Sequence, residues 1–298
     1  MPTASQITSL LSNETLARLE RLRIHNRHGF TDKRRGEHLS GRGGNSNEFS
    51  DFRDYVAGDD VRFVDWNAFA RLNRPYLKLY HEEEEMNVVL LIDASSSMMF
   101  DGKFARSCQL AAAFGAMGLH GGERVSAYVF NSKEEAPLRL PACGGRASIR
   151  KLFAFLEGIE GGGDAPLEKG IEQFLKRHRG RGVVLALSDF LTFGDLHKGL
   201  NRLFSSGLET FAIQILSPAE ISPDVSGDSR LVDCETGAIL DVTANAHLMT
   251  IYHEYRQDFE RTLAEYCQKR SGRFTSISSS APLESLLFDH LWRQGWLK

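Results

Sequence analysis

The segment from Met86 to Phe100, with the sequence MNVVLLIDASSSMMF, decides the expected fold. Its opening run is rich in Val, Leu and Ile, which is typical of a strand buried on both faces of a parallel sheet. Asp93 and a run of serines follow at once. The stretch from Phe104 to Leu119 is then apolar, rich in Ala and helical in spacing, and Gly121-Gly122 ends it. The segment therefore predicts a buried strand, a polar loop and a helix.

The chain beyond this segment alternates short apolar runs with helical stretches. Further strands are expected at Val125–Phe130, 137–142, Val183–Leu187, Thr210–Leu216 and Phe274–Ile277, and helices at Ile149–Leu156, Leu167–Arg177, Leu196–Phe204, His247–Arg270 and Leu283–Trp292. The two prolines of 137–142 place that strand at a sheet edge. A hairpin is expected over Leu231–Val242, turning at Glu235-Thr236-Gly237. This alternation predicts an α/β fold with a doubly wound, mostly parallel sheet flanked by helices.

The first 85 residues have a different character. Residues 13–25 are expected to form a helix capped by Ser12, and 26–50 are expected to form loops because they are rich in Gly, Arg, Asn and Ser. Residues 51–85 are polar and aromatic and fit no simple period. Their apolar content is too scattered for a separate core, so we expect an irregular segment packed on the sheet domain. The expected domains are 1–85 and 86–298.

The composition excludes several classes of protein. The chain has 298 residues, 42% of them hydrophobic, and its net charge of -3 does not favour a nucleic-acid partner. The four cysteines lie far apart without a CxxC pair, which favours free thiols over a zinc site. The N-terminus lacks the features of a signal peptide, and no run approaches the roughly 18 apolar residues of a membrane span. We therefore expect a cytoplasmic protein without a membrane span.

Polar residues follow two of the expected buried strands. Asp93, Ser95 and Ser97 come after the first strand, and Ser188-Asp189 follows Val183–Leu187. Doubly wound sheets bind ligands at the carboxyl ends of their strands, so these side chains are expected to meet at one edge. Carboxylate and hydroxyl oxygens are hard ligands that suit Mg²⁺ or Mn²⁺. The alternative is structural, with the serines capping the next helix and Asp93 bonded to its own loop.

The strand–DxSxS–helix opening and the later strand–Ser–Asp ending resemble the von Willebrand factor A family and its metal-ion-dependent adhesion site. That family takes a further ligand from a Thr, often within Gly-Gly-Thr, in the loop before a middle helix. Here the corresponding stretch is Gly161-Gly162-Gly163-Asp164, so Gly163 stands in place of the Thr and Gly163→Thr is expected to tighten the site. The resemblance implies a weakened Mg²⁺ or Mn²⁺ site formed by Asp93, Ser95, Ser97, Asp189 and, instead of the Thr, Asp164 or water.

A second resemblance covers roughly residues 30–290. It rests on an ordered series of polar and aromatic positions, Glu48-Phe49, Arg53-Asp54-Tyr55, Gly58-Asp59-Asp60, Arg62, Asp65-Trp66, Ala70-Arg71 and Lys78. Together with the DxSxS loop and the segment 232–237, this series is similar to the bacterial family catalogued as domain of unknown function 58. Its members resemble von Willebrand A domains and are often encoded beside MoxR-type AAA+ ATPases. The resemblance therefore implies a protein partner of that type.

The arginines and aspartates of the same segment have a physical interpretation of their own. Arg53, Arg62 and Arg71 are expected to make bidentate bonds to nearby aspartates, which would fasten a chain with little regular structure. Trp66 is expected to anchor the segment on the core. The alternative is a surface that a partner recognises.

No catalytic signature accompanies the candidate metal site. The sequence holds no GxxxxGK[ST] phosphate loop, HExxH or GxSxG, and its ten histidines show no ligand spacing. We therefore expect a non-enzymatic, metal-dependent interaction module, in which an acidic side chain of a partner completes the coordination of the ion. Two alternatives stay open: a metal-dependent hydrolase using Asp93, Asp164 and Asp189, and a structural domain with an empty site.

Overall fold

The computed structural model of the chain describes residues 6–26, 49–80, 86–132, 138–192, 195–224, 227–234 and 236–298. These residues fall into two compact units. The larger comprises 6–26 together with the described residues from 86 onward, and the smaller comprises 49–80. The N-terminal helix, which the sequence analysis groups with residues up to 85, lies in the larger unit. Most of the Gly- and Arg-rich stretch 26–50 lies outside the described residues.

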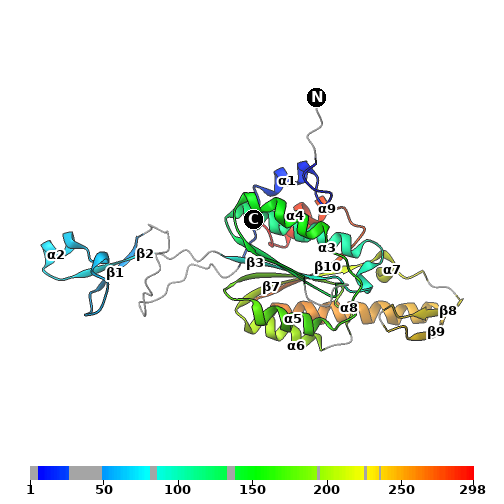
Figure 1. The fold of residues 1–298 in the computed structure, drawn as a ribbon. Coiled ribbons are helices and arrows are strands. Elements are labelled where there is room, and N and C mark those ends of the chain that lie inside the picture. The colour runs from blue at the N-terminus through cyan, green and yellow to red at the C-terminus, as the bar shows by residue number, and fades with distance from the viewer. Residues whose placement is uncertain are drawn as a thin grey trace, which may run out of the picture. The chain divides into compact units, whose positions relative to one another are not determined.

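A six-stranded sheet forms the centre of the larger unit (Figure 1). Its strands, in spatial order, are β10 (Arg273–Ser278), β7 (Leu208–Leu216), β6 (Gly182–Ser188), β3 (Asn87–Asp93), β4 (Arg124–Phe130) and β5 (Leu138–Cys143). All neighbouring pairs are parallel except β4 and β5. The expected doubly wound, mostly parallel sheet is confirmed, with the proline-containing strand at its edge.

Helices cover both faces of this sheet (Figure 1). One face carries α3 (Lys103–Gly121) and α4 (Ile149–Glu157), and the other carries α5 (Leu167–Arg177), α6 (Leu196–Ser205) and α8 (Ala246–Gln268). On the first face α3 approaches the strands closely, because a side chain at Gly118 would lie 2.9 Å from Val125. On the second face Leu91 of β3 belongs to a buried apolar cluster with Phe174 and Leu200. This two-sided burial explains why the central strands lack polar alternation.

The N-terminal segment is held against the larger unit by its apolar residues and by the C-terminus. Helix α1 (Asn13–Leu19) begins at Ser12, whose side chain caps Thr15 N as expected. The helix is shorter than the expected 13–25, because the chain beyond it leaves the helical path to pair with the C-terminus. Arg23 N donates to Lys298 O at 2.8 Å, and Ile24 forms an antiparallel bridge with Leu297.

The C-terminal half contains the expected hairpin and two helical features that the sequence analysis missed. The hairpin consists of β8 (Gly227–Val232) and β9 (Ile239–Ala244), which pair antiparallel. A short helix, α7 (Pro218–Ile221), follows β7 and begins with a capping box between Ser217 and Glu220. The expected last helix is divided into α9 (Leu283–Ser285) and a π-helical stretch, η4 (Leu286–Leu291).

Two short 3-10 turns lie before helices of the first face. They are η2 (Ser97–Met99), which precedes α3, and η3 (Arg146–Ser148), which precedes α4.

The smaller unit has more regular structure than its sequence predicts. Strand β1 (Phe49–Asp54) pairs antiparallel with β2 (Tyr76–Tyr80), and between them lie the 3-10 turn η1 (Val61–Phe63) and helix α2 (Trp66–Leu72). Two of the expected ion pairs form, Arg53 with Asp59 and Arg62 with Asp60. Within this unit Trp66, which is expected to anchor the segment on the core, is 61% exposed and packs edge-on against Phe69.

No helix in the described part of the chain is long and apolar enough to span a membrane.

Candidate functional site

Parallel strands bring several polar residues to one edge of the sheet. In β3 and β6, Ile92 lies beside Leu187, so the next residues along the two strands, Asp93 and Ser188, are also neighbours. Asp189 follows immediately. Strand β7 ends one position before Ser217, from which α7 begins. The candidate site therefore forms at the carboxyl edge of the sheet, where doubly wound folds place ligands.

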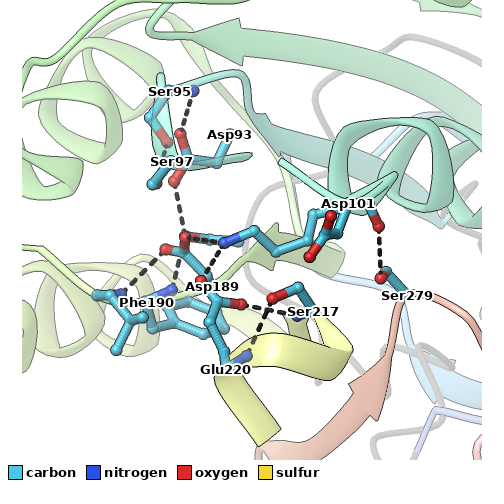
Figure 2. Close-up of polar contacts among 12 residues, drawn as sticks. Asp93, Ser95, Ser97, Asp101, Asp189, Phe190, Ser217, Glu220 and Ser279 are labelled. Atoms are coloured by element: carbon cyan, nitrogen blue, oxygen red, sulfur yellow. Dashed lines mark hydrogen bonds and ion pairs between the residues drawn. The ribbon is translucent and has the colours of Figure 1, made fainter. Parts of the chain in front are cut away.

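The DxSxS loop places its carboxylate and hydroxyls together (Figure 2). Asp93 Oδ1 accepts a hydrogen bond from Ser95 N at 3.0 Å, and Asp93 Oδ2 accepts one from Ser188 Oγ at 2.6 Å. The Oγ atoms of Ser95 and Ser97 lie 3.0 Å apart. Because backbone and hydroxyl donors hold Asp93, its carboxylate is fixed at the sheet edge and does not extend into solvent.

Asp93 carries a charge in an unfavourable environment. Burial raises its pKa, the nearby negative charge of Asp189 raises it further, and hydrogen bonds from Ser188 and Ser95 only partly offset both effects. The resulting pKa is about 6, against an ordinary value of 3.8. A buried carboxylate of raised pKa at the ligand-binding edge of a sheet is a feature of functional sites, because a cation bound there would relieve the cost of its charge.

The glycine loop lies beside the DxSxS loop, where the resemblance to von Willebrand A domains predicts it. Gly162 N donates to Ala94 O at 2.7 Å, and Ser96 N donates to Gly163 O at 2.9 Å. The expectation that Gly163→Thr tightens the site is not supported, since a Cβ on Gly163 would lie 2.8–2.9 Å from backbone atoms of Asn131. The close approach of two backbones requires glycine here. Asp164, the proposed substitute ligand, is exposed.

Asn131 is a polar residue of this site that the sequence analysis missed. It follows β4 directly, has a left-handed backbone with φ 60°, and accepts a hydrogen bond from Gly163 N through its main-chain oxygen. Its Nδ2 lies 3.4 Å from Asp93 Oδ1. Its Oδ1 is buried and has no hydrogen-bond partner among the described residues. A buried, unsatisfied carbonyl oxygen beside a buried carboxylate marks a place where a cation or an ordered water would be favourable.

A lysine sits on the other side of Asp189. Lys103, the first residue of α3, has no exposed surface, and its Nζ lies 3.0 Å from Asp189 Oδ2 and 2.5 Å from Glu220 Oε1. Burial lowers the pKa of Lys103, but the charges and hydrogen bonds of both carboxylates outweigh burial, so its pKa lies above the ordinary value. Figure 2 shows Asp189 between the loop of Asp93 and Glu220.

The residues around Asp93 fit a hard divalent ion. Mg²⁺ binds oxygen at about 2.0–2.1 Å in octahedral geometry, so adjacent ligand atoms are separated by about 3.0 Å. The Oγ atoms of Ser95 and Ser97 have that separation. Among the described residues no group of three or more His, Cys, Asp or Glu side chains is placed to hold a metal ion. An ion would therefore depend on one carboxylate, two hydroxyls and retained water, as Mg²⁺ commonly does.

Local sequence patterns predict Asp93, Ser95, Ser97 and Asp189 as site residues but not Lys103, Asn131 or Glu220. A signal for Lys103 exists, because a lysine in the first turn of an otherwise apolar helix opposes the helix dipole and is uncommon there without a partner. Asn131 follows a buried strand that is parallel to β3, so its position at the same edge follows from topology. Glu220 has no comparable signal, since α7 is only four residues long.

The fold and site define an α/β domain with an oxygen-rich loop at the carboxyl edge of its sheet. The family model described as "Protein of unknown function DUF58" matches residues 51–266. The chain belongs to this family, which confirms the resemblance seen in the sequence.

The chain is similar to relatives in sequence and, at lower identity, to solved structures. The chain is 30% identical over 265 residues to the uncharacterized proteins Rv1480 of Mycobacterium tuberculosis and Mb1516 of Mycobacterium bovis, with 86% of this chain and 80% of each relative covered. Among solved structures it is similar to BatB from Bacteroides thetaiotaomicron, with 11% identity, a TM-score of 0.41, and 70% and 98% of the two chains covered. An aerotolerance-related membrane protein from Bacteroides fragilis gives 15% identity, a TM-score of 0.38, and 64% and 91% coverage.

Proposed function

We propose that this chain is a non-enzymatic protein-interaction module that binds its partner through a divalent ion held by Asp93, Ser95 and Ser97. The observation that carries the proposal is the Asp93 carboxylate, which is buried at the sheet edge beside Asp189 and the hydroxyls of Ser95 and Ser97. Burial and the charge of Asp189 raise its pKa to about 6. An ion of the Mg²⁺ or Mn²⁺ type would neutralise it and keep open positions for water. A carboxylate of the partner would displace one of those waters.

Exposed apolar side chains near the ion site support a protein partner. Met99 and Phe100, just after the DxSxS loop, are 40% and 55% exposed, and Leu191, two residues after Asp189, is 48% exposed. Large apolar residues exposed around a polar centre are typical of interaction surfaces. A partner that offers a carboxylate flanked by apolar residues would match this edge.

By the resemblance to its family, the proposed partner is a MoxR-type AAA+ ATPase in the bacterial cytoplasm. A binding measurement between the two purified proteins tests the proposal, with Mn²⁺ or with chelator present. We expect binding with Mn²⁺, loss of binding with chelator, and loss with Asp93→Ala. Asp101→Asn is the control, because Asp101 is an exposed carboxylate of the same region whose left-handed backbone, with φ 46°, also suits Asn.

The test separates the proposal from its alternatives. Binding that survives both chelator and Asp93→Ala would remove the ion from the mechanism. If calorimetry detects no Mn²⁺ binding by the wild type, either alone or with the partner present, the alternative of a structural domain with an empty site is favoured.

A further inference from the structure

Lys103 occupies a position that disfavours a positive charge for two reasons. It is the first residue of α3, where the helix dipole is positive, and the preceding Gly102 offers no side-chain cap. Its side chain is also fully buried, which removes the hydration of the ammonium group. A lysine in such a place is stabilised only if carboxylates compensate it closely, so the two carboxylates beside it are essential to its position.

Those carboxylates are themselves fixed by further hydrogen bonds. Asp189 Oδ1 accepts from Leu191 N at 3.1 Å, which leaves Oδ2 for the ammonium. Glu220 Oε2 accepts from Ser217 N at 2.7 Å, which leaves Oε1 for the ammonium. The three side chains therefore form an ion cluster whose hydrogen bonds are satisfied, and this cluster joins the start of α3 to the end of β6 and to α7.

The carboxylates on the two sides of Asp189 differ in how their negative charge is balanced. On one side, Asp189 and Glu220 share the ammonium of Lys103. On the other side, the hydrogen bonds that Asp93 accepts from the described residues come from neutral groups, namely the Ser188 hydroxyl, the Ser95 N–H and the Asn131 amide. Within the described part of the chain, the side chains that interact with Asp93 thus include a second carboxylate but no cation.

We infer that Lys103 is a resident cation of the site, which balances Asp189 permanently and confines a divalent ion to Asp93 and the two serines. Asp189 is then not a direct ligand of the ion. The positive charge of Lys103 holds the affinity for the ion alone low, so that the ion and the carboxylate of the partner bind together. This inference rests on the proposed function only in assuming that Asp93, Ser95 and Ser97 hold the ion.

Calorimetric titration with Mn²⁺, without any partner, tests the inference. Lys103→Met removes the cation that pairs with Asp189 at 3.0 Å. Asp189 then becomes an uncompensated carboxylate beside Asp93, and a buried charge of that kind interacts strongly enough to change the affinity for a cation by about tenfold or more. We expect Lys103→Met to bind Mn²⁺ at least about tenfold more tightly than the wild type. Its melting temperature should fall in chelator and recover with Mn²⁺ more than that of the wild type does, because the ion replaces the lost charge.

A double variant distinguishes balancing from direct ligation. Lys103→Met with Asp189→Asn exchanges an ion pair for a neutral pair, so the net charge of the pair stays zero. We expect its Mn²⁺ affinity to lie within about threefold of the wild type, and the exchange of a buried ion pair for neutral groups is commonly tolerated by the fold. Lys198→Met, which removes an exposed lysine 3.7 Å from Glu168, is the matched control and should leave Mn²⁺ binding unchanged.

Each outcome decides the inference. Unchanged affinity in a folded Lys103→Met protein overturns it, and so does loss of Mn²⁺ binding in the double variant, since that result makes Asp189 a ligand. If the wild type alone binds no Mn²⁺ but Lys103→Met does, the resident cation is supported, and the binding measurement with the partner decides the proposed function. If no variant binds Mn²⁺, the inference fails. If the wild type and the double variant bind Mn²⁺ equally and Lys103→Met binds it more tightly, the inference stands whether or not a partner is found.

Discussion

At the scale of single residues, the Asp93 carboxylate reduces the stability of the folded protein when it is charged. The carboxylate is buried, is held by Ser95 and Ser188, and faces the charge of Asp189. Its pKa of about 6 exceeds the ordinary 3.8, so the folded state binds this proton more tightly than the unfolded state does. Protonation therefore favours folding. The contribution of Asp93 to stability falls as the pH rises from about 4 to about 6, and it stays lowest at higher pH.

Asp93→Asn should accordingly stabilise the protein in the presence of chelator. The amide keeps an acceptor for Ser95 N and carries no charge, so we expect a gain of about 1–3 kcal/mol in the free energy of unfolding near neutral pH. The gain should shrink toward zero near pH 4, where the wild-type carboxyl is also neutral. Urea unfolding at several pH values measures it. A loss of stability near neutral pH would contradict this prediction, because it would show that the folded protein stabilises the charged form of Asp93.

Gly163 leads to the opposite expectation from the one that family resemblance suggests. A Thr there would bring its Cβ within 2.9 Å of the Asn131 backbone, so we expect Gly163→Thr to destabilise the fold by about 1–3 kcal/mol and to weaken Mn²⁺ binding. Gly144→Thr is the control, because the nearest atom to a Cβ at Gly144 is 4.0 Å away. Thermal unfolding and calorimetry on both variants check this, and a stable Gly163→Thr protein with tighter Mn²⁺ binding would refute it.

At the scale of elements, the chain before α1 is attached to the end of α4 through one carboxylate. Glu157 Oε1 accepts hydrogen bonds from Thr8 Oγ1 at 2.7 Å, from Ser9 N at 2.7 Å and from Ser9 Oγ at 2.8 Å. Glu157 is the last residue of α4, where the helix dipole disfavours a negative charge. Donors from the N-terminal segment compensate this charge and lower the pKa of Glu157 below its ordinary 4.5.

Glu157→Gln should loosen the N-terminal segment in a pH-dependent manner. The folded pKa is lowered, so the stabilising contribution is present above the unfolded value of 4.5 and is lost as the pH falls through the folded pKa. We expect faster amide hydrogen exchange over residues 6–12 in the variant at neutral pH, and convergence of the two proteins in acid. The exposed Asp164→Asn is the control. Equal exchange at neutral pH would show that the three hydrogen bonds do not hold the segment.

At the scale of the whole molecule, the smaller unit is inserted between two parts of the larger one. The Nδ2 of Asn26 lies 3.3 Å from the Sδ of Met86, so the chain leaves the larger unit and returns to it at nearly the same point. The segment before residue 27 contributes buried side chains to the larger unit, including Leu11, Leu16 and Leu19. The larger unit is therefore made of two chain segments that are distant in sequence.

Replacing residues 28–84 with a short Gly/Ser linker should leave the larger unit folded. Four to six residues span the gap, since each extended residue covers about 3.3 Å. We expect a single cooperative thermal transition within about 5 °C of the corresponding wild-type transition. Residues 86–298 alone should be far less stable, because losing Leu11 and Leu19 removes about 2–5 kcal/mol each from the packing. An unfolded linker protein would instead mean that residues 28–84 stabilise the larger unit, in line with the expectation that residues 30–85 pack on the sheet domain.

The sequence by itself determined the elements of the sheet and the edge at which the site forms. Hydrophobic runs indicate buried strands, and helical spacing of apolar residues indicates the face of a helix that packs on the sheet. For this reason β3, β6 and α3 were predictable from local patterns. Parallel strands share one carboxyl edge, and for that reason Asp93 and Asp189 were predictable as neighbours. The capping Ser12 and the hairpin of β8 and β9 were predictable for the same local reasons.

Only the tertiary structure decided which groups meet at that edge and how their charges balance. The contact of Lys103 with Asp189 joins residues 86 positions apart, and it depends on where the first turn of α3 lies over the end of β6. The exclusion of a side chain at Gly163 depends on the Asn131 backbone, which belongs to another loop. The early end of α1 depends on the pairing of Arg23 with Lys298. Local periodicity carries no information on the distances between separate elements, because packing and strand register set those distances. The charge balance of the site depends on the same distances.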